Sequence, residues 1–198
     1  MKRLLIFLIS MSLYLSAFAQ PAFVDRCNMS YLNMLSGLPS NFVDDIYSDS
    51  FGFIWISTHG GGLVRYDGFS YRYFGVGSDG MSLKSNTCHN VVEDKFHRLW
   101  ISFEECTEVL DLKTMHSVVP KSKNDELKRI MSQMSVKVYC DSKGYIWIVD
   151  RNDICRVEFD ESGDVKDIIK FAYTNNTPDI AIADINNDGS VWAAVDGG

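Results

Sequence analysis

The residue types best suited to holding a cation lie in the stretch DINNDGSVW, residues 184–192. Asp184, Asn186 and Asp188 alternate there as in the first half of an oxygen-rich calcium loop. A helix-loop-helix site would need Glu at the twelfth position, where Val195 stands, so part of the coordination is missing. A hairpin turn explains the Asp and Gly of this stretch better. We therefore predict no metal site.

Sugar cleavage is the second chemistry to consider, because the chain contains 26 Asp and Glu residues. Glycoside hydrolysis needs two carboxyl groups at a defined separation across the scissile bond, and spacing along a sequence does not place such a pair. We therefore assign no catalytic residue. An exported lyase or glycosidase remains an alternative.

Varied polar residues stand four positions after each tryptophan and could form a ligand-binding surface. These candidates are His59, Glu104, Arg151 and Asp196. Differing side chains at equivalent positions of a repeated framework are typical of a recognition surface, because loops vary while the scaffold is kept. Ordinary solvated loops are the alternative interpretation.

The framework itself is an internal repeat centred on tryptophan. The four tryptophans are separated by 45, 47 and 45 residues. Asp or Asn stands six residues before each of them, and Gly or His stands three residues before. The predicted structural core of the repeat is Asp49, Gly52, Trp55, Asp94, Trp100, Asp141, Gly144, Trp147, Gly189 and Trp192. We expect Asp to cap a turn, Gly to supply a positive φ, and tryptophan to pack between neighbouring units.

Each unit has the composition of several short strands. FVDDIYSD, FIWIST, GLVRYD and SYRYF are runs of strand length in the first unit, and similar runs recur in the later ones. Four strands in about 45 residues is the size of a propeller blade. The predicted fold class is all-β, a partial β-propeller of four-stranded antiparallel blades, with about three and a half blades and an incomplete ring.

The domain boundaries follow from the repeat. We expect a signal peptide at 1–19 and a strand at 20–36 that would complete a last blade. The blades are predicted at 37–82, 83–127 and 128–174, with a partial fourth blade at 175–198. We expect the chain to be a fragment or a truncated gene product, because an incomplete ring leaves blade edges uncovered.

One segment, KNDELKRIMSQMS, departs from the strand pattern. Leu127, Ile130, Met131 and Met134 fall there at helical spacing, which predicts a short helical turn at a blade junction. A Met-lined ligand surface is the alternative.

The N-terminus indicates export. Lys2 and Arg3 precede an apolar run that ends at Ala17-Phe18-Ala19, a pattern typical of a secretory signal peptide. A retained membrane anchor is the alternative. The formal net charge of −7 argues against nucleic acid or an anionic membrane surface as the partner.

The cysteines indicate neither a disulfide framework nor a zinc site. There are five, at positions 27, 88, 106, 140 and 155, and none has CxxC spacing. We expect most of them to be small buried residues. Pairing of Cys88 with Cys106, or of Cys140 with Cys155, stays open.

Residues 37–74 resemble the two-component-regulator propeller repeat. They contain Gly-Leu-x-x-Asn, then Asp-x-x-Gly-x-Ile-Trp-Ile-x-Thr, Gly-Gly-Leu and Tyr-Asp. The second blade keeps LKSN and LWIS, but Glu104, Glu105 and Cys106 replace the glycines after the tryptophan. The third blade keeps Asp141, Gly144 and Trp147.

The resemblance implies an extracytoplasmic ligand-sensing segment of a bacterial hybrid two-component histidine kinase that responds to carbohydrate. It implies a membrane-anchored, homodimeric parent on the periplasmic side of the inner membrane. Further propeller, immunoglobulin-like, transmembrane and kinase regions would lie downstream. The residues in hand carry no kinase motif, so we expect no enzyme activity and no cofactor from them. The possible ligand is an oligosaccharide, and an exported interaction scaffold without a signalling role is an alternative.

Overall fold

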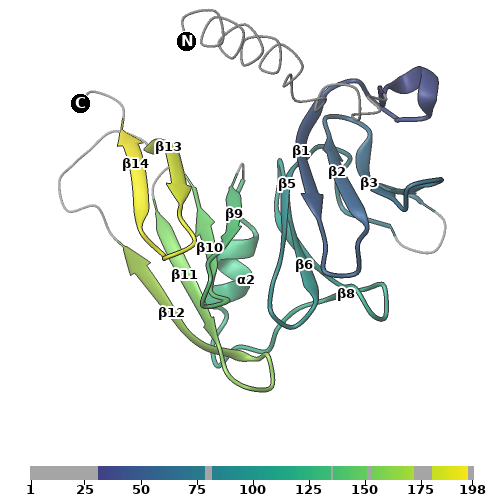
Figure 1. The fold of residues 1–198 in the computed structure, drawn as a ribbon. Coiled ribbons are helices and arrows are strands. Elements are labelled where there is room, and N and C mark those ends of the chain that lie inside the picture. The colour runs from purple at the N-terminus through teal and green to yellow at the C-terminus, as the bar shows by residue number, and fades with distance from the viewer. Residues whose placement is uncertain (1–30, 79–81, 135, 151–152, 172–179, 196–198) are drawn as a thin grey trace, which may run out of the picture. The chain divides into compact units, whose positions relative to one another are not determined.

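The computed structural model describes residues 31–78, 82–134, 136–150, 153–171 and 180–195 (Figure 1). The predicted signal peptide lies outside these ranges. Residues Asn33–Gly198 form one unit, to which the description below applies. Within the described ranges, no helix is long and apolar enough to cross a membrane.

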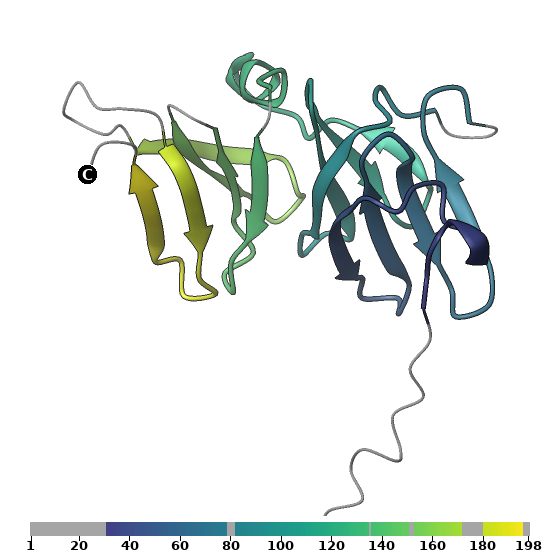
Figure 2. The ribbon, with the colours of Figure 1, turned by 90° about the horizontal axis from the view of Figure 1, so that it is seen from above.

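Three four-stranded sheets and one two-stranded sheet follow one another along the chain (Figure 1, Figure 2). The first sheet contains β1 (Val43–Ser48), β2 (Ile54–Thr58), β3 (Gly62–Tyr66) and β4 (Tyr71–Phe74). The second contains β5 (Cys88–Glu93), β6 (Arg98–Phe103), β7 (Thr107–Asp111) and β8 (His116–Val118). The third contains β9 (Lys137–Cys140), β10 (Ile146–Val149), β11 (Ile154–Phe159) and β12 (Val165–Phe171). The last contains β13 (Ile180–Ile185) and β14 (Val191–Val195).

Within every sheet the strands pair antiparallel in chain order, so each four-stranded sheet is one propeller blade. The first strands of successive blades lie beside one another, β1 next to β5 and β5 next to β9. The sheets do not close into a ring within the described residues. The predicted fold class, an open partial propeller of four-stranded antiparallel blades, is confirmed.

The core lies between the blades. Trp55 packs in one cluster with Val91 and Leu99 of the second blade, and Trp100 packs with Val138 and Ile146 of the third. Trp147 likewise packs with Ile185 of the two-stranded sheet. Both faces of β6 and β10 are buried for this reason, and they carry apolar residues in a nearly continuous run.

The outer flanks lack such cover in the described structure. Ile46 is 65% exposed, whereas Val91 at the equivalent place in the second blade is fully buried against the preceding blade. Trp192 is 71% exposed, unlike the other three tryptophans. The burial of a repeat position therefore depends on the neighbouring blade and not on its own motif.

A carboxylate holds the indole of each buried tryptophan. The Nε1–Oδ2 distances are 2.8 Å for Trp55–Asp49, 2.9 Å for Trp100–Asp94 and 2.9 Å for Trp147–Asp141. The other oxygen of each carboxylate accepts backbone N–H groups of the turn; Asp49 Oδ1, for example, lies 2.9 Å from the N atoms of Phe51 and Phe53. One side chain thus caps the hairpin turn and also satisfies a buried indole donor.

The turn position three residues before the tryptophan requires a left-handed backbone. The φ angles are 87° at Gly52, 76° at Gly144 and 82° at Gly189. His97 occupies the same position in the second blade with φ of 62°, which is uncommon for a residue with a side chain. Its Nδ1 lies 2.8 Å from Glu93 Oε1 and 3.0 Å from Ser50 Oγ, so contacts with the first blade accompany this conformation.

The buried carboxyl of Glu93 joins the first two blades. Burial acts to raise its pKa, but hydrogen bonds from Ser50 N and Oγ, both 2.6 Å long, and the contact with His97 hold the pKa below its usual value. A carboxyl with a lowered folded-state pKa contributes stability that is present above its unfolded-state pKa and is lost as the pH falls through the folded-state value.

We therefore expect Glu93→Gln to flatten part of the acid dependence of folding stability. The wild type should lose unfolding free energy below about pH 4, and the variant should lose less, because one linked carboxyl is gone. Urea unfolding from pH 7 to pH 3 measures this. Glu161→Gln, at an exposed position, is the control. Parallel pH profiles for wild type and Glu93→Gln would contradict the assignment.

The helix predicted near the second blade junction is present as α2 (Glu126–Met131), which precedes β9 (Figure 1). Leu127, Ile130 and Met131 are buried in the cluster that contains Trp100, and Met134 is exposed. The prediction of a short helical turn at this junction is confirmed.

The described cysteines are free, so neither pairing left open by the sequence is formed. Cys88 and Cys155 are buried, as expected for small core residues. Burial raises the pKa of Cys88 to about 12 and that of Cys155 to about 11, which keeps both thiols protonated. Cys27 lies outside the described residues.

The strand predicted at 20–36 falls largely outside the described residues. Residues 31–36, the described part of this range, contain no strand. Met34–Ser36 forms a 3₁₀ helix there, η2, which the side chain of Asn33 caps. The strand remains a prediction for the residues before Tyr31.

Candidate ligand-binding site

Ionisable side chains from three blades line a hollow of about 350 Å³ at the ends where β1, β5 and β9 begin. The lining residues are Asp44, His89, Glu104, Val136 and Lys137. Asp44 comes from the first blade, His89 and Glu104 from the second, and Lys137 from the third. The hollow thus lies where three blades meet.

Two strand irregularities place the polar groups there. The pairing of β1 with β2 shifts between Val43 and Asp45, and the pairing of β5 with β6 shifts between Cys88 and Asn90. The residues inside these shifts, Asp44 and His89, are left out of the regular ladder. A β-bulge of this kind bends the strand and redirects a side chain, and bulges often lie next to functional sites.

The residues after the bulges connect the blades. Asp45 Oδ2 accepts a hydrogen bond from Val91 N at 3.2 Å. In the next junction, Asn90 Nδ2 donates to Val138 O at 2.7 Å, and Val138 N donates to Asn90 Oδ1 at 3.2 Å. Equivalent side chains thus tie the first strand of each blade to the backbone of the next. These contacts between blades lie directly beside the hollow.

His89 lies between two carboxylates. Its Nε2 is 2.8 Å from Glu104 Oε2, and its Nδ1 is 3.5 Å from Asp44 Oδ2. The three side chains are partly exposed, between 27% for His89 and 42% for Glu104, so a ligand can reach them. Lys137 is exposed at the rim, while Val136 is buried and its carbonyl accepts a hydrogen bond from Ser102.

This arrangement suits recognition of a hydroxyl-rich ligand. The carboxylates accept hydrogen bonds from hydroxyl groups, and the ammonium of Lys137 donates them. Within the described ranges, no group of three or more His, Cys, Asp and Glu residues could hold a metal ion. The hollow therefore offers binding groups from three blades and no metal cluster.

The four residues predicted from the sequence differ in where they lie. Glu104 lines the hollow. His59 is exposed after β2, where its N–H donates to Phe42 O at 3.0 Å, and it does not line this hollow. Arg151 and Asp196 lie outside the described residues. The predicted ligand face therefore remains a proposal, to which the structure adds a specific location around Glu104.

Asp44, His89 and Lys137 were missed by the sequence analysis. Asp44 and His89 both stand eleven residues before a tryptophan, and Lys137 stands ten before one. These positions follow the repeat, so the spacing could have marked them. Their approach to Glu104 depends on the two bulges, which the sequence pattern does not show.

Comparison with known proteins agrees with the repeat and the fold. Residues 37–60 match the family described as two component regulator propeller. No curated protein sequence matches the chain significantly.

Two solved structures share the fold. One is the extracellular domain assigned to the hybrid two component system BT3049 from B. thetaiotaomicron, with a TM-score of 0.59, 20% identity, and coverage of 83% of this chain and 22% of that chain. The other is the extracellular domain assigned to the hybrid two component system BT4673 of the same organism, with a TM-score of 0.55, 19% identity, and coverage of 80% and 23%. The chain thus spans less than a quarter of the length of either structure, and at these identities the likeness shows the fold alone. The match to the two-component-regulator propeller repeat thus lies in the first blade, and the fold of the described residues is that of an open propeller segment.

Proposed function

We propose that this chain is an exported, ligand-sensing propeller segment of a hybrid two-component sensor, and that its ligand is a carbohydrate. The observation that carries the proposal is the hollow in which His89 lies between Asp44 and Glu104. Recognition without catalysis is the role that we assign to these residues. The repeat at 37–60 and the fold shared with two extracellular domains support the sensor context.

A carbohydrate fits the chemistry of the hollow. Sugars present many hydroxyl groups and few charges, and partly exposed carboxylates bind hydroxyl donors without having to be fully desolvated. The formal net charge of −7 argues against nucleic acid as the ligand.

Signalling follows from the placement of the hollow at blade junctions. A ligand that contacts Asp44, His89 and Lys137 together favours one relative arrangement of the three blades over others. A ligand can shift the equilibrium between two blade arrangements only as far as its affinities for the two arrangements differ. The hydrogen bonds of Asp45 and Asn90 would pass such a shift from blade to blade.

A panel of oligosaccharides tested by calorimetry and thermal shift examines the proposal. A glycan that binds should raise the apparent stability by mass action. Glu104→Gln should weaken that binding about tenfold, since a hydrogen bond to a charged group contributes on the order of 1.5–3 kcal/mol. Glu161→Gln should leave it unchanged, because Glu161 is exposed in the turn before β12.

Two outcomes would count against the proposal. If no glycan binds while a protein partner does, the carbohydrate class is wrong and an interaction scaffold is favoured. If a glycan binds equally well to the wild type and to Glu104→Gln, the ligand lies elsewhere on the chain.

A further inference from the structure

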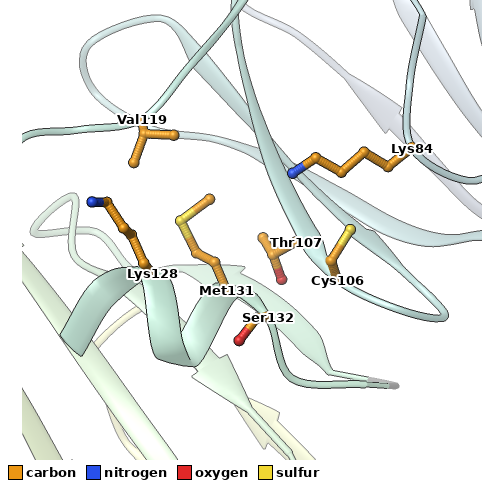
Figure 3. Close-up of a pocket in the computed structure, with 7 residues that line it drawn as sticks. All are labelled: Lys84, Cys106, Thr107, Val119, Lys128, Met131 and Ser132. Carbon is orange, nitrogen blue, oxygen red and sulfur yellow. The ribbon is translucent and has the colours of Figure 1, made fainter. Parts of the chain in front are cut away.

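A second hollow, of about 280 Å³, lies where the second blade meets α2 (Figure 3). Its lining residues are Lys84, Cys106, Thr107, Val119, Lys128, Met131 and Ser132. Cys106 lies in the β6–β7 loop with Glu104, which lines the first hollow, and Thr107 is the first residue of β7. One loop that departs from the glycine pattern of the repeat therefore contributes to both hollows.

The charges here differ from those of the first hollow, because the ionised side chains are two lysines. Figure 3 shows Lys84 extending from the connection before β5 with its nitrogen directed into the hollow, and Lys128 on the opposite wall. The backbone of Lys84 is fixed by a hydrogen bond from its N–H to Glu108 Oε1, 2.7 Å long. Lys128 Nζ lies 3.1 Å from the exposed carboxylate of Asp125.

The field of Lys84 reaches the floor of the hollow. Burial raises the pKa of the Cys106 thiol, with further rises from Glu108 and Glu105, while Lys84 acts in the opposite direction. Lys84 is thus the group near Cys106 that favours a negative charge there, against the effects of burial and of the two glutamates.

A buried hydroxyl adds a second and independent feature. Thr107 is 1% exposed, and its Oγ1 has no hydrogen-bond partner among the described residues. Leaving a buried hydroxyl unpaired costs on the order of 1–3 kcal/mol, so such groups are uncommon outside functional sites. Ser132 supplies a second hydroxyl, and Val119 and Met131 form an apolar wall.

We propose that this second hollow binds the carboxylate of an acidic sugar residue, a hexuronate. The ammonium of Lys84 would pair with the carboxylate, and Thr107 Oγ1 would donate to a ring or carboxyl oxygen. Ser132 Oγ, which donates to Arg129 O, would accept from a sugar hydroxyl, and Val119 and Met131 would pack against the C–H face of the ring. The inference rests on the proposed function, because it names the class of carbohydrate that the same face would select.

The test compares ligands that differ only in the carboxylate. Calorimetry on the full chain would use short galacturonate oligosaccharides, their methyl esters, neutral galactose oligosaccharides and succinate. The free acid should bind about tenfold more tightly than its ester, and Lys84→Gln should abolish that preference. Lys113→Gln removes the same charge from an exposed turn and should retain the preference.

A second measurement localises the ligand without any variant. The galacturonate oligosaccharide should slow alkylation of Cys106 by iodoacetamide severalfold, measured by peptide mass spectrometry. Cys140, which is also half-buried but does not line this hollow, is the internal control. If Lys84→Gln does not fold, protection of Cys106 in the wild type still shows whether the ligand lies in the second hollow.

The outcomes separate this inference from the proposed function. Equal affinity for acid and ester, an unchanged preference in Lys84→Gln, or unprotected Cys106 overturns the hexuronate site. Neutral sugars bound in a Glu104-dependent manner would still support the proposed function in those cases. If succinate binds through Lys84 and no sugar binds, a carbohydrate is the wrong ligand class in both proposals. If none of the four ligands binds, the hexuronate proposal is overturned as well.

Discussion

Trp100→Ala is expected to lower the free energy of unfolding by about 3–5 kcal/mol, the range for truncating a large aromatic side chain in a packed core. Trp100 is fully buried between the second and third blades, in contact with the cluster that also holds Val138 and Ile146. The substitution leaves a cavity between the second and third blades, so it weakens the packing of both. Chemical denaturation followed by circular dichroism measures the change.

Trp192→Ala is the matched control for that prediction. Trp192 has the equivalent place in the repeat but is 71% exposed in this chain, so its loss should change stability by no more than about 0.5 kcal/mol. Equal costs for the two substitutions would show that the indoles do not act through burial between blades.

Asp94→Ala is expected to cost about 3–5 kcal/mol, in the range for breaking a buried ion pair by removing one partner. Asp94 Oδ2 accepts from Trp100 Nε1 at 2.9 Å and from Arg98 Nε at 2.7 Å, and its Oδ1 accepts the N–H groups of Phe96 and Arg98. Without the carboxylate, a buried indole donor, two turn donors and a guanidinium lose their acceptor together. Denaturant unfolding again gives the measurement.

Two other aspartates provide the comparison for Asp94→Ala. Asp49→Ala should cost less, because Asp49 binds its indole and turn but no arginine is paired with it in the contacts described here. Asp160→Ala, in an exposed turn, should have a much smaller effect. A loss at Asp94 no larger than at Asp160 would mean that the carboxylate matters only for the turn.

Much of the fold could be predicted from the sequence because its signals are local. The β-branched and aromatic runs FIWIST and RLWISF predict strands, and the spacing of the tryptophans predicts equivalent sheets. The positive φ at Gly52 follows from the tight turn. The exposure of Trp192 could not be predicted, because it depends on what packs against the neighbouring face.

The candidate site was predictable only in part. Glu104 was identified because it varies at a repeated position beside a loop that departs from the glycine pattern. Asp44 and His89 were not, because the bulges that bring them together with Glu104 arise from strand pairing. The hydrogen bond between Asp and the indole could have been predicted from the constant interval of six residues between them. The predicted role of Asp as a turn cap accounts for only one of its two carboxylate oxygens.

Hydrogen–deuterium exchange of the full chain, with and without a bound oligosaccharide, tests most directly whether the hollow at the blade junctions is the recognition site. Slower exchange is predicted at 43–45, 88–90, 104–107 and 136–138, with little change in the turns at 49–53 and 94–98 on the opposite ends of the strands. Protection confined to those opposite turns, or no protection by any glycan, would contradict the assignment of this site.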